Sequence, residues 1–320
     1  MTSIVLKSFM FSIKFWFDFH IVKSWWEHLN FVDEIEAKAF FDENKDFINA
    51  KPFVKWVWWK RQLIKQFGKF FPTDFGDYYE PFLWWGAVFF NLQKEKSYLS
   101  DVNSELINLY QVVKGKPKEL IEYLEKQEIS KERFLEMRLW DREENWQKKY
   151  SKIERAGRFM YMNRTCFNWI YRVNSKWEFN VPFWKYKNPD IVQRENLLNA
   201  SRLLNETKAE IKLQSFEKVL DNAQSWDFVY FDPPYDVLTE SANFTSYNEN
   251  GFGRDMQKKL RDIFVELDKK WVFVMLSNHN TPFIRELYKW FKFEIVKARR
   301  NVNSKGNGRG EIEEIVVRNY

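Results

Sequence analysis

The residues best placed to do chemistry are Asp232-Pro233-Pro234-Tyr235, which directly follow the apolar run DFVYF at 227–231. That run predicts a buried strand, and open α/β sheets bind ligands at the carboxyl ends of their strands. The Asp232 carboxylate and the Pro233 carbonyl are two acceptors on a backbone that the prolines stiffen, and Tyr235 offers a flat face for stacking. The alternative reading is a proline turn that only ends a strand.

The composition favours a nucleic-acid partner without requiring one. The 320 residues suffice for one large domain or two smaller ones, and the net charge is +6. A single cysteine, Cys166, excludes an intrachain disulfide and a cysteine-rich zinc site, and we expect no metal and a cytoplasmic protein. The apolar stretch at 9–22 is interrupted by Lys14, Asp18 and His20, so we expect neither a signal peptide nor a membrane partner.

Glycine is scarce in this chain and tryptophan is abundant. About 22 glycines are expected at the usual frequency, whereas the chain has 10 glycines and 16 tryptophans. The segment EPFLWWGAVFFNL (80–92) reads as strand, turn and helix, yet its turn carries Trp84-Trp85. A turn that leads into a helix beside a ligand usually needs glycine, which alone permits positive φ without strain. The two indoles are therefore anomalous at this place.

Alternating strand and helix patterns predict an α/β doubly wound sheet. After a leader of unknown role at 1–49, we expect strands at 78–83 and 97–101 and a helix from Ala87. Residues 104–166 read as mainly helical, and the irregular, basic segment 167–190 is a candidate recognition surface. Beyond the strand 227–231, the pattern predicts a helix at 254–270 and strands at 271–276, 293–298 and 311–317.

Eight blocks in order resemble those of the Dam-type (D12 class) DNA adenine-N6 methyltransferases. They are KPFVKWVWWK (51–60), EPFLWWGAVFFNL (80–92), SDVN (100–103), FNWIYRVNSKWEFNVPFWKYKNP (167–189), DPPY (232–235), ANFTSY (242–247), LSNHNT (276–281) and RRNVNSKGNGRG (299–310). The resemblance implies a Rossmann-like sheet that binds S-adenosylmethionine, built from 50–103 and 200–320. It also implies an inserted, mainly helical DNA-recognition domain at 104–199.

The reaction that the resemblance implies explains the box at 232–235. The exocyclic amine of adenine is a poor nucleophile because its lone pair is delocalised into the ring. The Asp232 carboxylate and the Pro233 carbonyl can hold both N–H bonds and shift the nitrogen towards sp³, while Pro234 helps to preposition them. Tyr235 would stack on a base flipped from the duplex. The methyl group would move directly from the sulfonium, without a covalent enzyme intermediate.

The cofactor residues are likewise carried over from the resemblance. They are Trp56 and Lys60 in the first block, Glu80 and Phe82 in the second, Asp101 in SDVN, and Asp232. A carboxylate suits the ribose hydroxyls that Asp101 would bind. As alternatives, Trp56 could be a core residue, Lys60 a surface charge and Asp101 a helix N-cap.

The resemblance also implies double-stranded DNA as the partner, with GATC as the target sequence. Arg172 matches a position that reads guanine, which suits a bidentate fork on O6 and N7, and Asn168 and Tyr186 match DNA-contacting positions. Four basic residues near the C-terminus are expected to contact phosphates: Arg299, Arg300, Lys305 and Arg309. The enzyme could have a cognate restriction endonuclease in the same system as a partner, or it could act alone, and both alternatives stay open.

The chain departs from the family in one systematic way. Tryptophan stands at family glycine positions 58, 59, 84, 85, 169, 177 and 184, whereas Trp56 and Trp140 stand where tryptophan is expected. We hypothesise that UGA codons, which some bacteria decode as glycine, have been translated as tryptophan; Trp25, Trp26, Trp226, Trp271 and Trp290 are further candidates.

Two other readings take the tryptophans as real. Indoles at 84 and 85 would then fill the cofactor space, which predicts a catalytically inactive DNA-binding relative that folds poorly. An aromatic pocket evolved for another ligand is the third reading. A rival with the same chemistry is RNA or protein methylation, but that group favours Asn-Pro-Pro-Tyr and lacks the 104–199 insert.

Overall fold

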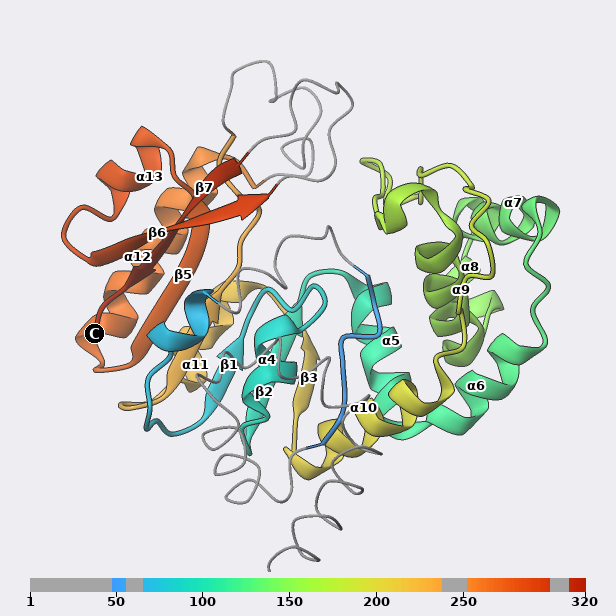
Figure 1. Cartoon of the computed structure of the whole chain (residues 1–320), viewed down its shortest axis with the longest axis horizontal. Coiled ribbons are helices and arrows are strands. Elements are labelled where there is room, and N and C mark those ends of the chain that lie inside the picture. The colour runs from blue at the N-terminus through green and yellow to red at the C-terminus, as the bar shows by residue number, and fades with distance from the viewer. Residues whose placement is uncertain (1–47, 56–65, 238–251, 300–310) are drawn as a thin grey trace, which may run out of the picture.

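A computed structural model describes residues 48–55, 66–237, 252–299 and 311–320. Its centre is a seven-stranded sheet in the order β3-β2-β1-β4-β5-β7-β6 (Figure 1). The strands are β1 (Tyr78–Glu80), β2 (Ser97–Asp101), β3 (Glu210–Leu213), β4 (Phe228–Phe231), β5 (Phe273–His279), β6 (Lys292–Arg299) and β7 (Glu311–Arg318). The strands β3, β2, β1, β4 and β5 are parallel, and β7 runs antiparallel to both of its neighbours.

Strand β4 shows why the centre of the sheet is buried on both faces. All four of its residues are buried, as expected for a parallel strand covered on two sides. Because side chains alternate along a strand, Phe228 and Tyr230 pack in one hydrophobic cluster and Val229 and Phe231 in another. The expected α/β sheet is confirmed.

Helices cover both faces of this sheet. α4 (Ala87–Leu92) and α5 (Ser104–Gly115) contribute to the cluster of Phe228, whereas α11 (Val219–Asn222), α12 (Arg254–Lys269) and α13 (Pro282–Leu287) contribute to that of Val229. Short 3-10 turns lie at Gly68–Phe70, Trp140–Arg142, Phe167–Trp169 and Phe216–Lys218. None of the helices in the described ranges has the length and apolar character needed to span a lipid bilayer.

Six helices lie between β2 and β3 in the chain. They are α5, α6 (Pro117–Glu125), α7 (Lys131–Leu139), α8 (Trp146–Lys149), α9 (Lys152–Thr165) and α10 (Arg194–Glu206). α6 to α9 gather on the opposite side of the molecule from α12 and α13 (Figure 1). Asn103 caps α5 through the N–H groups of Glu105 and Leu106, and Ser151 and Glu154 form a capping box on α9.

Most of the expected elements are confirmed, with a few differences. The strand expected from Trp271 begins at Phe273, because Trp271 and Val272 bond back to the end of α12. The sequence patterns did not predict β3, α10, α11 or α13. Of the expected leader at 1–49, residues 1–47 lie outside the described residues.

A buried ion pair ties the helices together. Arg158 on α9 lies 2.6 Å from Asp141, and both side chains are only 2% exposed. Arg158 also donates to the Met137 carbonyl, and Asp141 accepts from the Phe179 N–H. The pair therefore joins α9, the turn at 140–142 and the segment around Phe179.

Replacing Arg158 tests this joint. Arg158→Met should lower the free energy of unfolding by about 3 kcal/mol, because it removes the buried cation and leaves the Asp141 carboxylate paired only with the partly exposed Arg142. The control Arg202→Met breaks a pair with Glu206 in which both side chains are about half exposed, and should cost less than about 1 kcal/mol. Urea titrations measure both; equal losses would contradict this account.

Candidate active site

The order of the strands reverses between β1 and β4, which are parallel neighbours. β2 lies beyond β1 on one side, and β5 lies beyond β4 on the other. The segments 81–86, 102–103 and 232–236 therefore all leave the sheet at the same edge. Open α/β sheets bind ligands at such a reversal, and the expected catalytic box is part of it.

The Asp232 carboxylate is held from the neighbouring strand. Its side chain is buried, and its Oδ1 accepts a hydrogen bond of 3.1 Å from the Ser277 hydroxyl on β5. The Ser277 hydroxyl also lies 2.9 Å from that of Tyr230, one residue before the end of β4. The sheet thus fixes the orientation of the carboxylate before any ligand arrives.

The rest of the box is anchored to α12 and β5. The Pro234 carbonyl accepts from the Gln257 side-chain amide at 2.7 Å, and the Asp236 N–H donates to Asn278 Oδ1 at 2.9 Å. The Thr281 hydroxyl donates to the Asp236 carboxylate at 2.7 Å. These bonds, together with two prolines, leave the backbone acceptors prepositioned.

Tyr235 is held at both its hydroxyl and its ring. The hydroxyl donates to Glu314 Oε2 on β7 at 2.9 Å, and the ring meets His279 edge-on with 5.0 Å between centroids. Burial, and then the Glu314 charge, raise the pKa of Tyr235 well above 10. The phenol therefore stays neutral at physiological pH and presents a ring of fixed orientation.

Trp84, in the turn after β1, connects Asp101 at the end of β2 to the box at 232–235. The buried Asp101 carboxylate accepts from the N–H groups of Trp84 at 3.2 Å and Asn103 at 2.9 Å. Burial raises the pKa of Asp101 to about 6, although these backbone bonds oppose the rise. The Trp84 indole Nε1 donates to the Asp232 main-chain carbonyl at 2.7 Å. Trp84 thus spans the two strand ends, with its main-chain N–H at Asp101 and its indole at the Asp232 carbonyl.

Glu80 and Phe82, which were expected at the cofactor, have structural contacts. Glu80 is buried and accepts from the Tyr78 hydroxyl and the Phe89 N–H, both at 2.9 Å, so it ties β1 to the first turn of α4. Phe82 stacks on Phe216 with 5.2 Å between ring centroids. Their contact with a cofactor stays a prediction.

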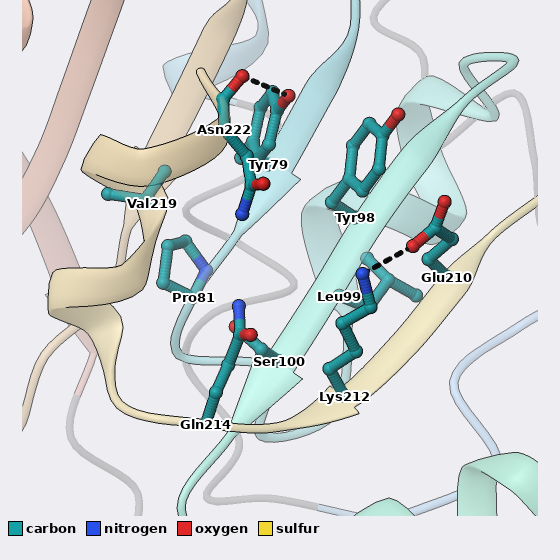
Figure 2. A pocket seen from close by; sticks show the side chains of 10 residues that line it. All are labelled: Tyr79, Pro81, Tyr98, Leu99, Ser100, Glu210, Lys212, Gln214, Val219 and Asn222. Carbon is teal, nitrogen blue, oxygen red and sulfur yellow. Dashed lines mark hydrogen bonds and ion pairs between the residues drawn. The ribbon is translucent and has the colours of Figure 1, made fainter.

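Figure 2 shows a pocket that adjoins this site on the same sheet. Its lining residues come from β1, β2, β3 and the α11 region: Tyr79, Pro81, Tyr98, Leu99, Ser100, Glu210, Lys212, Gln214, Val219 and Asn222. Pro81 directly follows Glu80, and Ser100 directly precedes Asp101. Neither Asp101 nor Asp232 lines the pocket.

The expected DNA-contacting residues lie in the irregular segment after α9. Tyr186 stacks on Trp169 with 4.7 Å between ring centroids, and the Lys55 ammonium lies 3.7 Å over the centre of the Trp169 ring. Asn168 directly precedes Trp169 in the same tight turn. Arg172 is exposed, and its Nε donates to Asn180 Oδ1 at 2.8 Å. The turn therefore brings Asn168 and Tyr186 into one patch, with Arg172 close in sequence.

Several expected site residues cannot be placed. Trp56, Lys60 and Arg300 lie outside the described residues, as do Lys305 and Arg309; Arg299 ends β6. The structure also adds residues that sequence reasoning missed. Ser277 stood in the LSNHNT block but was given no role, and nothing in the sequence marked Glu314 as a partner of Tyr235.

The comparisons with known proteins agree with this fold. A model of the D12 class N6 adenine-specific DNA methyltransferase family matches residues 56–302. A Type II methyltransferase of Lactococcus lactis subsp. cremoris is 47% identical over 278 residues, which cover 86% of this chain and 98% of the relative. A Type II methyltransferase of Methanocaldococcus jannaschii is 37% identical over 294 residues, with 85% and 100% covered.

A DNA adenine methylase of Escherichia coli (strain K12) is 33% identical over 268 residues, which cover 83% of this chain and 94% of the relative. The seven-stranded α/β sheet, with an acidic box at the end of β4, is consistent with a methyltransferase fold. The chain belongs to the D12 class of N6 adenine-specific DNA methyltransferases.

The raised pKa of Asp101 makes a prediction about stability. Because the folded state favours the protonated acid, Asp101 stabilises the fold at low pH, and this contribution is lost as the pH rises through its pKa of about 6. Relative to Asp101→Asn, the free energy of unfolding should fall by about 2.4 kcal/mol from about pH 4 to about pH 7. Denaturant titrations across this range measure it; parallel curves for the two proteins would contradict it.

Proposed function

We propose that this protein transfers a methyl group from S-adenosylmethionine to N6 of adenine in duplex DNA, at GATC. This is the activity of a site-specific DNA methyltransferase (adenine-specific), EC 2.1.1.72. The observation that carries the proposal is the buried Asp232 carboxylate, which Ser277 orients at the end of β4. Family membership supports the adenine target.

The Asp-Pro-Pro-Tyr box would act on the amine by holding its hydrogens. The Asp232 carboxylate accepts one N–H and the Pro233 carbonyl accepts the other, which localises the nitrogen lone pair and makes it nucleophilic. Because Gln257 and Asn278 already anchor the loop, these acceptors need little reorganisation during the reaction.

Tyr235 would hold the target base. N6 is engaged in base pairing inside the duplex, so the adenine must leave the stack before it can react. The ring of Tyr235 is fixed by Glu314 and His279 and is neutral, which suits stacking on a flipped base.

The residues at the ends of β1 and β2 fit the methyl donor only in part. S-adenosylmethionine supplies an electrophilic methyl group and carries a ribose with two hydroxyl groups. The Asp101 carboxylate suits those hydroxyls, and we assign Trp56, Lys60, Glu80 and Phe82 to the same ligand by resemblance. The Trp84 side chain does not fit, because it extends from the main chain beside Asp101 to the Asp232 carbonyl.

We assign target recognition to residues 104–199, which hold α5 to α9 and the first part of α10. The exposed Arg172 would read guanine, and Asn168 and Tyr186 would contact DNA beside it. Arg299 and Arg300 would contact phosphates. Since a relative at 47% identity is named a Type II methyltransferase, we include a cognate restriction endonuclease among the proposed partners, and we place the protein in the cytoplasm.

The test is a methylation assay on a GATC duplex, with N6-methyladenine measured by mass spectrometry of the nucleosides. The assay uses a variant in which glycine replaces tryptophan at the seven family positions 58, 59, 84, 85, 169, 177 and 184. We expect methylation of this duplex and not of one with the GATC scrambled. Asp232→Ala should lower the rate at least about a hundredfold, because it removes an acceptor aimed at the reacting amine.

Asp221→Ala is the matched control, because Asp221 is an exposed acid on α11 that pairs only on the surface with Lys218. Its rate should match that of the parent protein. Methylation of RNA alone would refute the DNA substrate. Binding of DNA without methylation of any substrate would instead indicate an inactive DNA-binding relative.

A further inference from the structure

Tryptophan in this fold is concentrated at backbone positions that suit glycine. Of the ten tryptophans among the described residues, five have φ in the left-handed region: Trp84 (43°), Trp169 (55°), Trp177 (62°), Trp226 (71°) and Trp271 (60°). Only a few per cent of non-glycine residues have positive φ, and bulky ones there are outliers. Seven other non-glycine residues of the described chain share it, and three of them are asparagine, which tolerates it well.

We propose that the protein made in its own cells carries glycine at positions 84, 169, 177, 226 and 271, through codons that its host reads as glycine. The resemblance to the family marked Trp84, Trp169 and Trp177 among seven positions. Positive φ supports glycine at those three positions without reference to any relative, and it supports glycine equally at positions 226 and 271.

Trp271 occupies a helix C-terminal position at which glycine is preferred. It follows Lys270, the C-cap of α12; its N–H bonds to the Asp268 carbonyl at 2.9 Å, and the Val272 N–H bonds to the Leu267 carbonyl at 3.1 Å. This pair of bonds defines a Schellman motif, whose left-handed residue is usually glycine.

Lys208 occupies the equivalent position after α10, with φ of 50° and the same two bonds. A side chain can therefore stand in this motif, and a single left-handed residue does not establish glycine. Glycine is indicated because half of the described tryptophans share this conformation.

Trp169 and Trp177 occupy two further turn positions at which glycine is preferred. Asn168 and Trp169, both with positive φ, are the central pair of a turn closed from the Ile170 N–H to the Phe167 carbonyl. A turn with two left-handed central residues favours Asn-Gly. Trp177 closes a turn that starts at Asn174, because its N–H bonds to the Asn174 carbonyl. The Asn174 N–H bonds to the Glu178 carbonyl. A left-handed residue after such a turn forms a bulge that favours glycine.

Trp226 and Trp84 complete the set. Trp226 is the third residue of a turn closed from the Asp227 N–H to the Gln224 carbonyl, where positive φ calls for glycine. Trp84 is the second residue of a turn closed from the Gly86 N–H to the Leu83 carbonyl, where positive φ again favours glycine.

The side chains at three of these positions contribute little packing. Trp177, Trp226 and Trp271 are 53%, 65% and 79% exposed. By contrast, Trp140 is buried and stacks on Tyr150 with 3.9 Å between ring centroids, and Trp146 lies under the guanidinium groups of two arginines. Neither Trp140 nor Trp146 has positive φ. These two tryptophans have the surroundings of native ones.

Position 84 connects the proposal to the site. Glycine there would remove the indole that bonds to the Asp232 carbonyl, while the residue 84 N–H could still donate to Asp101. The Trp84 side chain, which does not fit beside a ligand at the ends of β1 and β2, would then be absent. The neighbouring Trp85 lacks positive φ, as do Trp184 and Trp290, so the backbone does not indicate glycine at these three positions.

The first test reads the gene and the native protein. We expect UGA at the five positions and UGG at Trp140 and Trp146, and tryptic peptides of the protein purified from its own cells should have masses that require glycine at the five. UGG codons, or peptide masses that require tryptophan, would overturn the proposal.

The second test measures the strain in the recombinant protein. Replacing the five tryptophans with glycine together should raise Tm by roughly 10 °C, because each substitution relieves a left-handed backbone. Trp140→Gly should lower Tm, and Lys208→Gly calibrates the relief at one position whose codon is not in question. A five-fold variant no more stable than the parent would overturn the proposal. Neither test depends on methylation, so failure of this proposal is distinguishable from failure of the proposed function.

Discussion

The parallel pairing of β1 with β4 is the constraint on which the rest of the site depends. Tyr78 lies opposite Phe228 and Tyr79 opposite Val229, so the two strands end together. The turn after Glu80 then faces the box that begins at Asp232. Any shift of this register would separate the Trp84 turn from the box, because the Trp84 indole donates to the Asp232 carbonyl across these strand ends.

Burial of acidic groups is the main cost of building this edge of the sheet, because a buried charge needs specific partners. Each acid has them. Glu80 caps the first turn of α4, Asp101 accepts two backbone N–H groups, Asp232 accepts from Ser277, and Asp236 accepts from Thr281. Asp232 and Asp236 are thus oriented by residues 45 positions away in the sequence, and Glu80 and Asp101 by residues within 17 positions, so the carboxylates are held before any ligand binds.

The sequence predicted the elements that have strong local patterns. β4 is a continuous apolar run and α12 has regular apolar spacing, so both were expected within two residues of their ends. β3 was missed because it lies at the edge of the sheet and its residues are mostly exposed, which gives no hydrophobic pattern. α13 was missed because it is short and has a single buried residue, Ile284.

The site was predictable in its parts and not in its contacts. The box at 232–235 and the acid at the end of β2 could be assigned from motifs, because strand ends place them at one edge. The bond from Tyr235 to Glu314 spans 79 residues, and that from Ser277 to Asp232 spans 45. Such pairs follow from the β4-β5-β7 order, and no local pattern in the sequence encodes that order.

The most direct test of the account is a calorimetric titration of S-adenosylhomocysteine, the demethylated product of the proposed donor, into two forms of the protein. The account predicts that the chain with Trp84 and Trp85 does not bind it, because the Trp84 side chain extends from the main chain beside Asp101 to the Asp232 carbonyl. The form with Trp84→Gly and Trp85→Gly should bind one equivalent, and Asp101→Ala in that form should weaken the binding. Equal affinity in the two forms would contradict the account, since the indole would then lie outside the ligand's site.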